Sequence, residues 1–165
     1  MIHVKYHSGL YTLTVEQELN TTLDNAWAFF SNPANLAKIT PKKMGFEISS
    51  AKTESMYPGQ IIAYRVGIFP FIKSSWVTEI THVNKKVYFV DEQRFGPYSM
   101  WHHEHHFLPK DDGMVVQDKV SYKIPCGILG RFAHWLFIRN QLNSIFKHRF
   151  IVLNKHFNKY NHPAT

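Results

Sequence analysis

The sequence is poor in cysteine and contains no long apolar run. Cys126 is its only cysteine, so an internal disulfide is excluded, and the neighbouring residues Ile-Pro-Cys-Gly include no basic partner for a reactive thiolate. No stretch approaches the roughly 18 apolar residues needed to span a bilayer. The first residues, MIHVKYHSGLYTL, lack the apolar stretch and small-residue cleavage site of a secretory signal. We therefore expect a cytoplasmic protein without stable membrane insertion.

Sequence motifs for nucleotides and for serine hydrolysis are also missing. There is no dinucleotide-binding fingerprint, P-loop or nucleophile elbow, so we expect neither those chemistries nor an organic cofactor. The formal charge of +7 permits an anionic partner, but no Lys/Arg-rich block or nucleic-acid motif accompanies it, so nucleic acid is not expected. The basic residues near the C-terminus are Arg131, Arg139, Lys147, Arg149, Lys155 and Lys159. They indicate a solvated helix face, with docking on an anionic surface as the alternative.

The chain has enough apolar residues for one domain over residues 1–165, since 44% of its 165 residues are hydrophobic. Leu10 to Leu19 alternates apolar and polar residues, which predicts a half-buried strand. Asp24 is the predicted N-cap of a short helix, and Asn32-Pro33 begins a second one that ends before Thr40-Pro41. The predicted order therefore starts with one strand and two short helices.

Six further strands are predicted, followed by a long helix. The strands are Met44–Ser49, Gln60–Val66, Phe71–Val83, Lys86–Arg94, Tyr98–Leu108 and Met114–Ile124, and the short turns between most of them favour an antiparallel meander. After Pro125-Cys126-Gly127 an apolar stripe with helical spacing comprises Trp135, Ile138, Leu142, Ile145, Phe146, Phe150, Leu153 and Phe157. This amphipathic helix is the only element large enough to cover one face of the sheet, and a curved sheet leaves a cavity beneath a straight helix.

The element order and three segments, VYFVDEQRFGPYSMWHHEHHF, DKVSYKIPCGILGRFAHWLF and RNQLNSIFKHRFIVL, resemble the START-like (SRPBCC) superfamily. The match is closest to its bacterial ligand-binding branch, which is often grouped with polyketide cyclase/dehydrase-like proteins. The resemblance implies an α+β helix-grip fold: a seven-stranded curved antiparallel sheet wrapped around the long C-terminal helix, with two short helices after the first strand. It also implies a ligand cavity between sheet and helix, but it names no ligand.

The segment FGPYSMWHHEHHFLPKDDG concentrates four of the eleven histidines within five residues. On a strand, His103 and His105 share one face with Trp101 and Phe107, whereas His102 and His106 lie on the other. We expect the first face to point into the cavity. If the neighbouring strands present their matching faces, one polar wall comprises Asp91, Gln93, His103, His105 and Asp118. The turn between Lys110 and Gly113 sets the register of the two strands, which decides whether Asp118 faces His103 or Glu104.

Three interpretations of this wall stay open. His103, His105 and Asp118 could bind a metal ion, although we expect none. The same three residues are candidates for general acid/base catalysis in a cyclisation or dehydration. The favoured interpretation is a hydrogen-bonded network that orients a hydrophobic or amphipathic ligand of lipid or aromatic, polyketide-like character. The predicted ligand-binding residues are Trp76, Asp91, Gln93, Trp101, His103, His105 and Tyr122.

The apolar segment Gly67–Phe71 falls at a predicted hairpin tip. There it could serve as a portal or membrane-touching loop, or pack on a neighbouring loop or subunit. A homodimer is accordingly among the expected states. Trp76 and Tyr122 each have an alternative to a ligand-binding role. Trp76 could be a core tryptophan, and Tyr122 could be a strand tyrosine with a hydrated hydroxyl.

Overall fold

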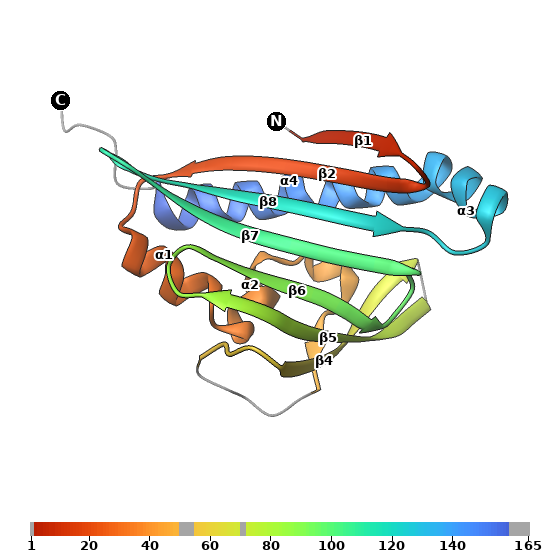
Figure 1. The fold of residues 1–165 in the computed structure, drawn as a ribbon, viewed down its shortest axis with the longest axis horizontal. Helices are drawn as coiled ribbons and strands as arrows, with labels where there is room; N and C mark the ends of the chain where they lie inside the picture. Colours follow the sequence, from red (N-terminus) through yellow and green to blue (C-terminus); the bar gives the residue numbers. More distant parts are fainter. Residues whose placement is uncertain (1, 50–54, 70–71, 159–165) are drawn as a thin grey trace.

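The protein is described here by a computed structural model that covers residues 2–49, 55–69 and 72–158. These residues form one antiparallel sheet of eight strands, in the order β1-β2-β8-β7-β6-β5-β4-β3 (Figure 1). The strands are β1 (His3–His7), β2 (Leu10–Leu19), β3 (Glu47–Ile48), β4 (Gln60–Phe69), β5 (Ile72–Asn84), β6 (Tyr88–Phe95), β7 (Met100–Lys110) and β8 (Gly113–Lys123). The predicted helix-grip architecture is confirmed, but the predicted count of seven strands is wrong.

The additional strand is β1, which pairs with β2 through a tight turn at Ser8 and Gly9. Both turn residues have positive φ, at 49° and 84°, as a two-residue hairpin turn requires. Four of the five residues of β1 are exposed, so the strand lacks the alternation of burial that β2 shows. A strand that is exposed on both faces leaves no apolar pattern in the sequence.

Short helices follow β2, as predicted. They are α1 (Leu23–Phe30), the 3₁₀ turn η1 (Pro33–Asn35), α2 (Leu36–Ile39) and a second 3₁₀ turn η2 (Lys42–Met44). The predicted N-cap is wrong by two residues: Thr22, and not Asp24, accepts the backbone N–H of Asn25 through its side chain. Asp24 lies in the first turn, where its carboxylate forms an ion pair with Lys86 at 2.6 Å.

The C-terminal helical region consists of α3 (Gly127–Ala133), a π-helical segment η3 (His134–Ile138) and α4 (Arg139–Phe157). Along α4 the buried residues are Leu142, Phe146, Arg149 and Leu153. Two members of the predicted apolar stripe are exposed instead, Trp135 at 67% and Phe150 at 43%. The π-helical segment adds a residue to its turn, so that His134 is buried in place of Trp135. Along α4, Arg149 is buried at the position where Phe150 was expected.

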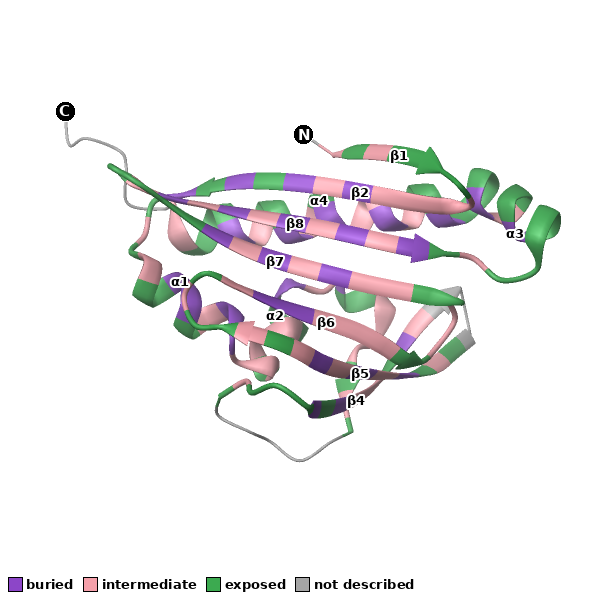
Figure 2. Ribbon diagram, viewed as in Figure 1, coloured by how far each residue is buried: buried purple, intermediate pink, exposed green. Residues whose placement is uncertain are grey.

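The register of the central strands is set at the turn between β7 and β8. Gly113 has φ of +136°, and a Cβ there would lie 2.5 Å from the carbonyl oxygen of Leu19, so the turn requires glycine. From this turn onward burial alternates strictly along β8 (Figure 2), and the buried residues Val120 and Tyr122 belong to the same core cluster as Leu142 and Phe146 of α4. Val116 belongs to one apolar core cluster and Val120 to the other, so Asp118 lies between them.

Within the described part of the chain, no helix is both long enough and apolar enough to cross a membrane. The apolar hairpin tip predicted at Gly67–Phe71 includes Pro70 and Phe71, which lie outside the described residues, as does Lys159.

Candidate functional site

A cavity of about 200 Å³ lies between the sheet, the short helices and α4. Its lining is predominantly apolar and aromatic. Phe29, Phe30, Leu36 and Ile39 come from the short helices; Ile62, Val66, Trp76, Ile80 and Phe89 come from β4 to β6; and Leu142, Ile145 and Phe146 come from α4. Charged and ionisable residues on β6, β7 and α4 interrupt this lining.

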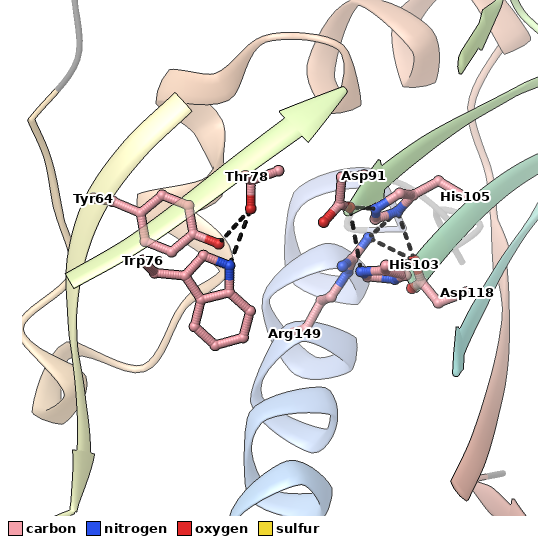
Figure 3. Close-up of polar contacts among 8 residues, drawn as sticks. All are labelled: Tyr64, Trp76, Thr78, Asp91, His103, His105, Asp118 and Arg149. Atoms are coloured by element: carbon pink, nitrogen blue, oxygen red, sulfur yellow. Dashed lines mark hydrogen bonds and ion pairs between the residues drawn. The ribbon is translucent and has the colours of Figure 1, made fainter. Parts of the chain in front are cut away.

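The polar place is built by three adjacent strands. Asp91 on β6 lies directly opposite His103 on β7, and His105 lies directly opposite Asp118 on β8. His103 reaches both carboxylates, with Nε2 3.1 Å from Asp118 Oδ1 and Nδ1 3.5 Å from Asp91 Oδ2. His105 does the same, with Nδ1 2.8 Å from Asp118 and Nε2 2.9 Å from Asp91. We call these four residues and Arg149 the polar cluster (Figure 3).

Arg149 enters the polar cluster from α4. Its Nη2 atom lies 3.0 Å from Asp118 Oδ1, and its guanidinium carbon lies 5.3 Å from the centroid of the Phe30 ring. The residue is only 7% exposed, so its predicted position on a solvated helix face is wrong. Arg149 Nε is buried and has no hydrogen-bond partner among the described residues. A buried donor of this kind requires an acceptor, and a bound water or ligand group is the usual one.

The two carboxylates of the polar cluster are held ionised. Burial alone would raise the pKa of Asp118, but the guanidinium of Arg149 and the hydrogen bonds from both histidines hold it well below its usual range. Burial likewise opposes ionisation of Asp91, and the charges of the two histidines and Arg149 outweigh it, so that its pKa is also lowered. Both carboxylates are therefore anionic at neutral pH.

The two histidines are shifted in opposite directions. Burial and the adjacent charge of His105 lower the pKa of His103, against the attraction of both carboxylates. Burial would also lower the pKa of His105, but its hydrogen bonds to Asp118 and Asp91 outweigh burial and raise it. The shifts make His105 the more basic of the two histidines, whose ring centroids are 3.8 Å apart. With His105 protonated and His103 neutral, the two carboxylates would balance one imidazolium and one guanidinium.

A second polar group lines the same cavity across from the polar cluster (Figure 3). The Thr78 hydroxyl accepts the indole N–H of Trp76 at 3.0 Å and lies 3.2 Å from the Tyr64 hydroxyl. Burial raises the pKa of Tyr64, so the phenol stays neutral. Trp76 also packs edge-on against Trp101, with ring centroids 5.2 Å apart. The cavity therefore offers two polar regions separated by aromatic surface.

The predicted site residues divide into two groups. Trp76, Asp91, Trp101, His103 and His105 line the cavity, and Asp118 lies behind the two histidines. Gln93 and Tyr122 do not line it. Gln93 bonds the backbone N–H and carbonyl of Tyr98 across the β6–β7 turn. Tyr122 is fully buried, with its hydroxyl 2.9 Å from His134 Nε2.

Sequence reasoning did not single out Arg149, Tyr64 or Thr78. A signal for Arg149 was present, because it lies seven residues after Leu142 and four before Leu153, at the spacing of a buried helix stripe. Because Arg149 is charged, we expected it on a solvated face of the helix instead. Tyr64 and Thr78 carried no comparable signal, because each is one polar residue among several on its strand, and only the pairing of Tyr64 with Trp76 brings them together.

Asp91, His103 and His105 could also hold a metal ion, since one ligand atom from each lies within 4.8 Å of the others. The third potential ligand is thus Asp91, rather than the Asp118 considered from sequence. The residues suit zinc or another cation that accepts nitrogen and oxygen ligands. However, His103, His105 and Arg149 already compensate the charge of Asp91 and lower its pKa without a further cation. Asp91 and the two histidines lie close enough to hold a metal ion, but the charge of Asp91 is compensated without one.

Comparison with solved structures finds the same architecture at low sequence identity. The protein TTHA0849 from Thermus thermophilus aligns with a TM-score of 0.68 and 12% identity, over 92% of this chain and 99% of that chain. Ginseng major latex-like protein 151 aligns with a TM-score of 0.66 and 11% identity, over 91% and 99%. Norcoclaurine synthase from Thalictrum flavum aligns with a TM-score of 0.61 and 15% identity, over 89% and 88%.

These solved structures have the START-like helix-grip fold, so the resemblance seen in the sequence is confirmed for the fold. No protein-family model matches the chain, and no curated protein sequence matches it either. Identities this low establish the fold alone, and the function must be argued from the cavity and the polar cluster.

Proposed function

We propose that the protein binds a small hydrophobic or amphipathic molecule in the cavity under α4. The observation that carries the proposal is the polar cluster itself, a buried group of two carboxylates, two histidines and an arginine beside a predominantly apolar, aromatic cavity. Binding sites for small molecules commonly combine an apolar lining with a few polar groups that fix orientation. The ligand's apolar part would contact the aromatic lining, and its polar group would contact His103, His105 or Arg149.

The cavity limits the size and charge of the ligand. Its volume of about 200 Å³ somewhat exceeds that of an engineered cavity of roughly 150 Å³ that binds benzene. A molecule with one or two rings, or an aliphatic group of similar volume, is the best match. A hydroxyl or carbonyl group can hydrogen-bond to the polar cluster without adding a buried charge. A carboxylate would instead require a compensating proton, which His103 could accept.

The comparison supports a small aromatic ligand. The structure of Thalictrum flavum norcoclaurine synthase with this fold is a complex with dopamine and hydroxybenzaldehyde, each of which has a single ring. Those compounds belong to that protein, and here they indicate only that molecules of this size fit a helix-grip cavity. Phenols, naphthols and short-chain fatty alcohols form a suitable first panel of probes.

The binding proposal is tested by titrating this panel against matched histidine variants, using isothermal calorimetry. His103→Ala and His105→Ala remove polar groups from the cavity, whereas His102→Ala and His106→Ala remove the same side chain from the opposite face of β7. Loss of a buried hydrogen-bond partner leaves the hydroxyl of the probe unsatisfied, which should weaken binding of a hydroxylated probe by about 10- to 100-fold in the first pair only. Equal affinities in all four variants would refute a role for the polar cluster in binding.

A second candidate function is acid/base catalysis on the bound molecule. It is favoured by the opposite pKa shifts of two adjacent histidines, since a neutral His103 can accept a proton and a protonated His105 can donate one. His103→Gln should then reduce turnover of a cyclisation or dehydration substrate by about 100-fold or more, with Kd changed much less. Binding without turnover across a panel of such substrates would leave the binding function alone.

A further inference from the structure

The segment formed by α3 and η3 exposes an unusual number of large apolar side chains. Six of them, which we call the α3 patch, are Ile128 (75% exposed), Leu129 (76%), Phe132 (60%), Trp135 (67%), Leu136 (36%) and Phe137 (57%). The rings of Phe132 and Trp135 lie 6.2 Å apart, so they form a continuous surface. The segment projects beyond the end of the sheet (Figures 1 and 2). Exposed apolar clusters of this kind mark interaction sites.

The α3 patch is held in place by the opposite side of the same helical segment. Gly130 packs so closely on the residues that follow β8 that a Cβ would lie 2.0 Å from the Pro125 carbonyl oxygen. His134 is buried, stacks on Tyr11 with ring centroids 3.8 Å apart, and pairs with the Tyr122 hydroxyl. Ile138 is buried in an apolar core cluster with residues of β2 and β8. These anchors face the sheet, so the apolar residues must face outward.

The charge of the surrounding chain favours an anionic partner for the α3 patch. After Asp118 the sequence contains eight Lys and Arg residues and no Asp or Glu, whereas residues 1–118 contain eleven basic and twelve acidic residues. The net positive charge of the protein therefore resides in residues 119–165, and Arg131 and Arg139 are the members of this basic region that lie in or beside the α3 patch. Arg131 and Arg139 are exposed within and beside the patch. Tryptophan and phenylalanine flanked by arginine are typical of helices that lie in the interface of an anionic membrane.

We propose that the α3 patch docks the protein on the surface of a membrane that contains anionic lipid. The apolar side chains enter the boundary between headgroups and acyl chains, and Arg131 and Arg139 contact lipid phosphates and carboxylates. This contact is peripheral and needs no spanning helix. The exposed apolar side chains and the two arginines would support this docking whatever molecule the cavity binds.

The test is flotation of the full chain with vesicles of pure phosphatidylcholine and with vesicles that contain about one third phosphatidylserine, enough to give a strongly negative surface. We expect binding to the anionic vesicles, weakened by raised salt, because screening reduces the arginine contribution. Brominated lipid in the same vesicles should quench Trp135, since the other tryptophans are buried or half-buried. The Trp135→Phe variant should lose this quenching and thereby assign the signal.

Two variants and two controls separate the patch from general surface effects. Arg131→Gln/Arg139→Gln should weaken binding about thirtyfold, at about 1 kcal/mol for each basic residue near an anionic surface. Phe132→Ser/Trp135→Ser should weaken it at least as much. The matched controls remove exposed groups from α4: Lys147→Gln/Lys155→Gln for charge, and Phe150→Ser/Ile151→Ser for apolar surface. Circular dichroism verifies that each variant is folded.

Failure of the wild-type protein to bind either kind of vesicle would overturn the proposal, as would equal losses in patch variants and controls. Light scattering provides a further decisive outcome. A dimer that Phe132→Ser/Trp135→Ser converts to a monomer, together with absent vesicle binding, would overturn it in favour of a second copy of the chain as the occupant of the α3 patch.

Discussion

His105 on β7 lies directly opposite Asp118 on β8, and its Nδ1 atom is 2.8 Å from the carboxylate oxygen. The same oxygen lies 3.0 Å from Arg149 Nη2 and 3.1 Å from His103 Nε2. Asp118 is thus the shared acceptor of the polar cluster, only 4% exposed. Because one buried carboxylate connects three cationic or polar side chains, substitutions in the polar cluster should be strongly coupled.

Arg149→Met tests whether this arginine is structural. It removes one partner of a buried ion pair and leaves Asp118 less compensated, so we expect the free energy of unfolding to fall by about 3–5 kcal/mol at pH 7. Lys147→Met on the exposed face of the same helix should change it by less than about 0.5 kcal/mol. Urea unfolding of both variants measures the two free energies. An equally small change in both would contradict the buried ion pair and indicate that Arg149 is solvated.

Asp118→Asn tests the depressed pKa of this carboxyl group. A lowered folded-state pKa contributes stability above the ordinary carboxyl pKa of about 4, and this contribution is lost as pH falls through the lower folded-state value. The difference in unfolding free energy between wild type and variant should therefore be constant from neutral pH to about pH 5 and shrink below about pH 4. Asp112→Asn, in the exposed β7–β8 turn, is the control. A difference that does not change with acidification would contradict the shift.

His105→Gln tests the opposite sign. The raised folded-state pKa of His105 contributes stability that is fully present below its ordinary value of about 6.5 and is lost as pH rises through the folded-state value. The variant should therefore be most destabilised, relative to wild type, near about pH 6 and less so near about pH 9. Chemical unfolding at both pH values is the measurement, with His106→Gln on the other face as the reference. A larger loss at the higher pH would show that the shift has the other direction.

Gly130→Ala tests the attachment of α3. Alanine normally stabilises a helix relative to glycine, but here the new Cβ would meet the Pro125 carbonyl oxygen at 2.0 Å. We expect a loss of about 1–3 kcal/mol in the free energy of unfolding, as in other overpacked sites. Asn140→Ala, at an exposed position of α4, should be neutral or stabilising. Stabilisation by Gly130→Ala would mean that α3 is not held against the end of β8.

The sequence predicted the site where its signal was local. Alternation along β7 placed His103 and His105 on one buried face, because strand periodicity fixes side-chain direction whatever the partner strand is. It could not decide whether Asp118 shared that face, since this depends on the tight turn that ends at Gly113. Arg149 was missed because charge is normally a sign of exposure, and its compensation by Asp118 comes from a distant strand.

The same contrast applies to the fold. Strong apolar patterns predicted β2, the meander and the long helix, whereas β1 is exposed on nearly every residue and escaped notice. The π-helical segment η3 could not be predicted from the spacing of apolar residues, because that spacing assumes a constant number of residues per helical turn. Trp135, Leu136 and Phe137 of the α3 patch lie in this segment.

Native mass spectrometry is the most direct test of the proposed function. Wild-type protein incubated with the panel of one- and two-ring hydroxylated probes should retain a single probe molecule, whereas Ile62→Phe, which fills the cavity from β4, should retain none while remaining folded. We expect this difference, together with weakened retention in His103→Ala. Equal retention by wild type and Ile62→Phe, or none by either across the whole panel, would contradict binding in the cavity.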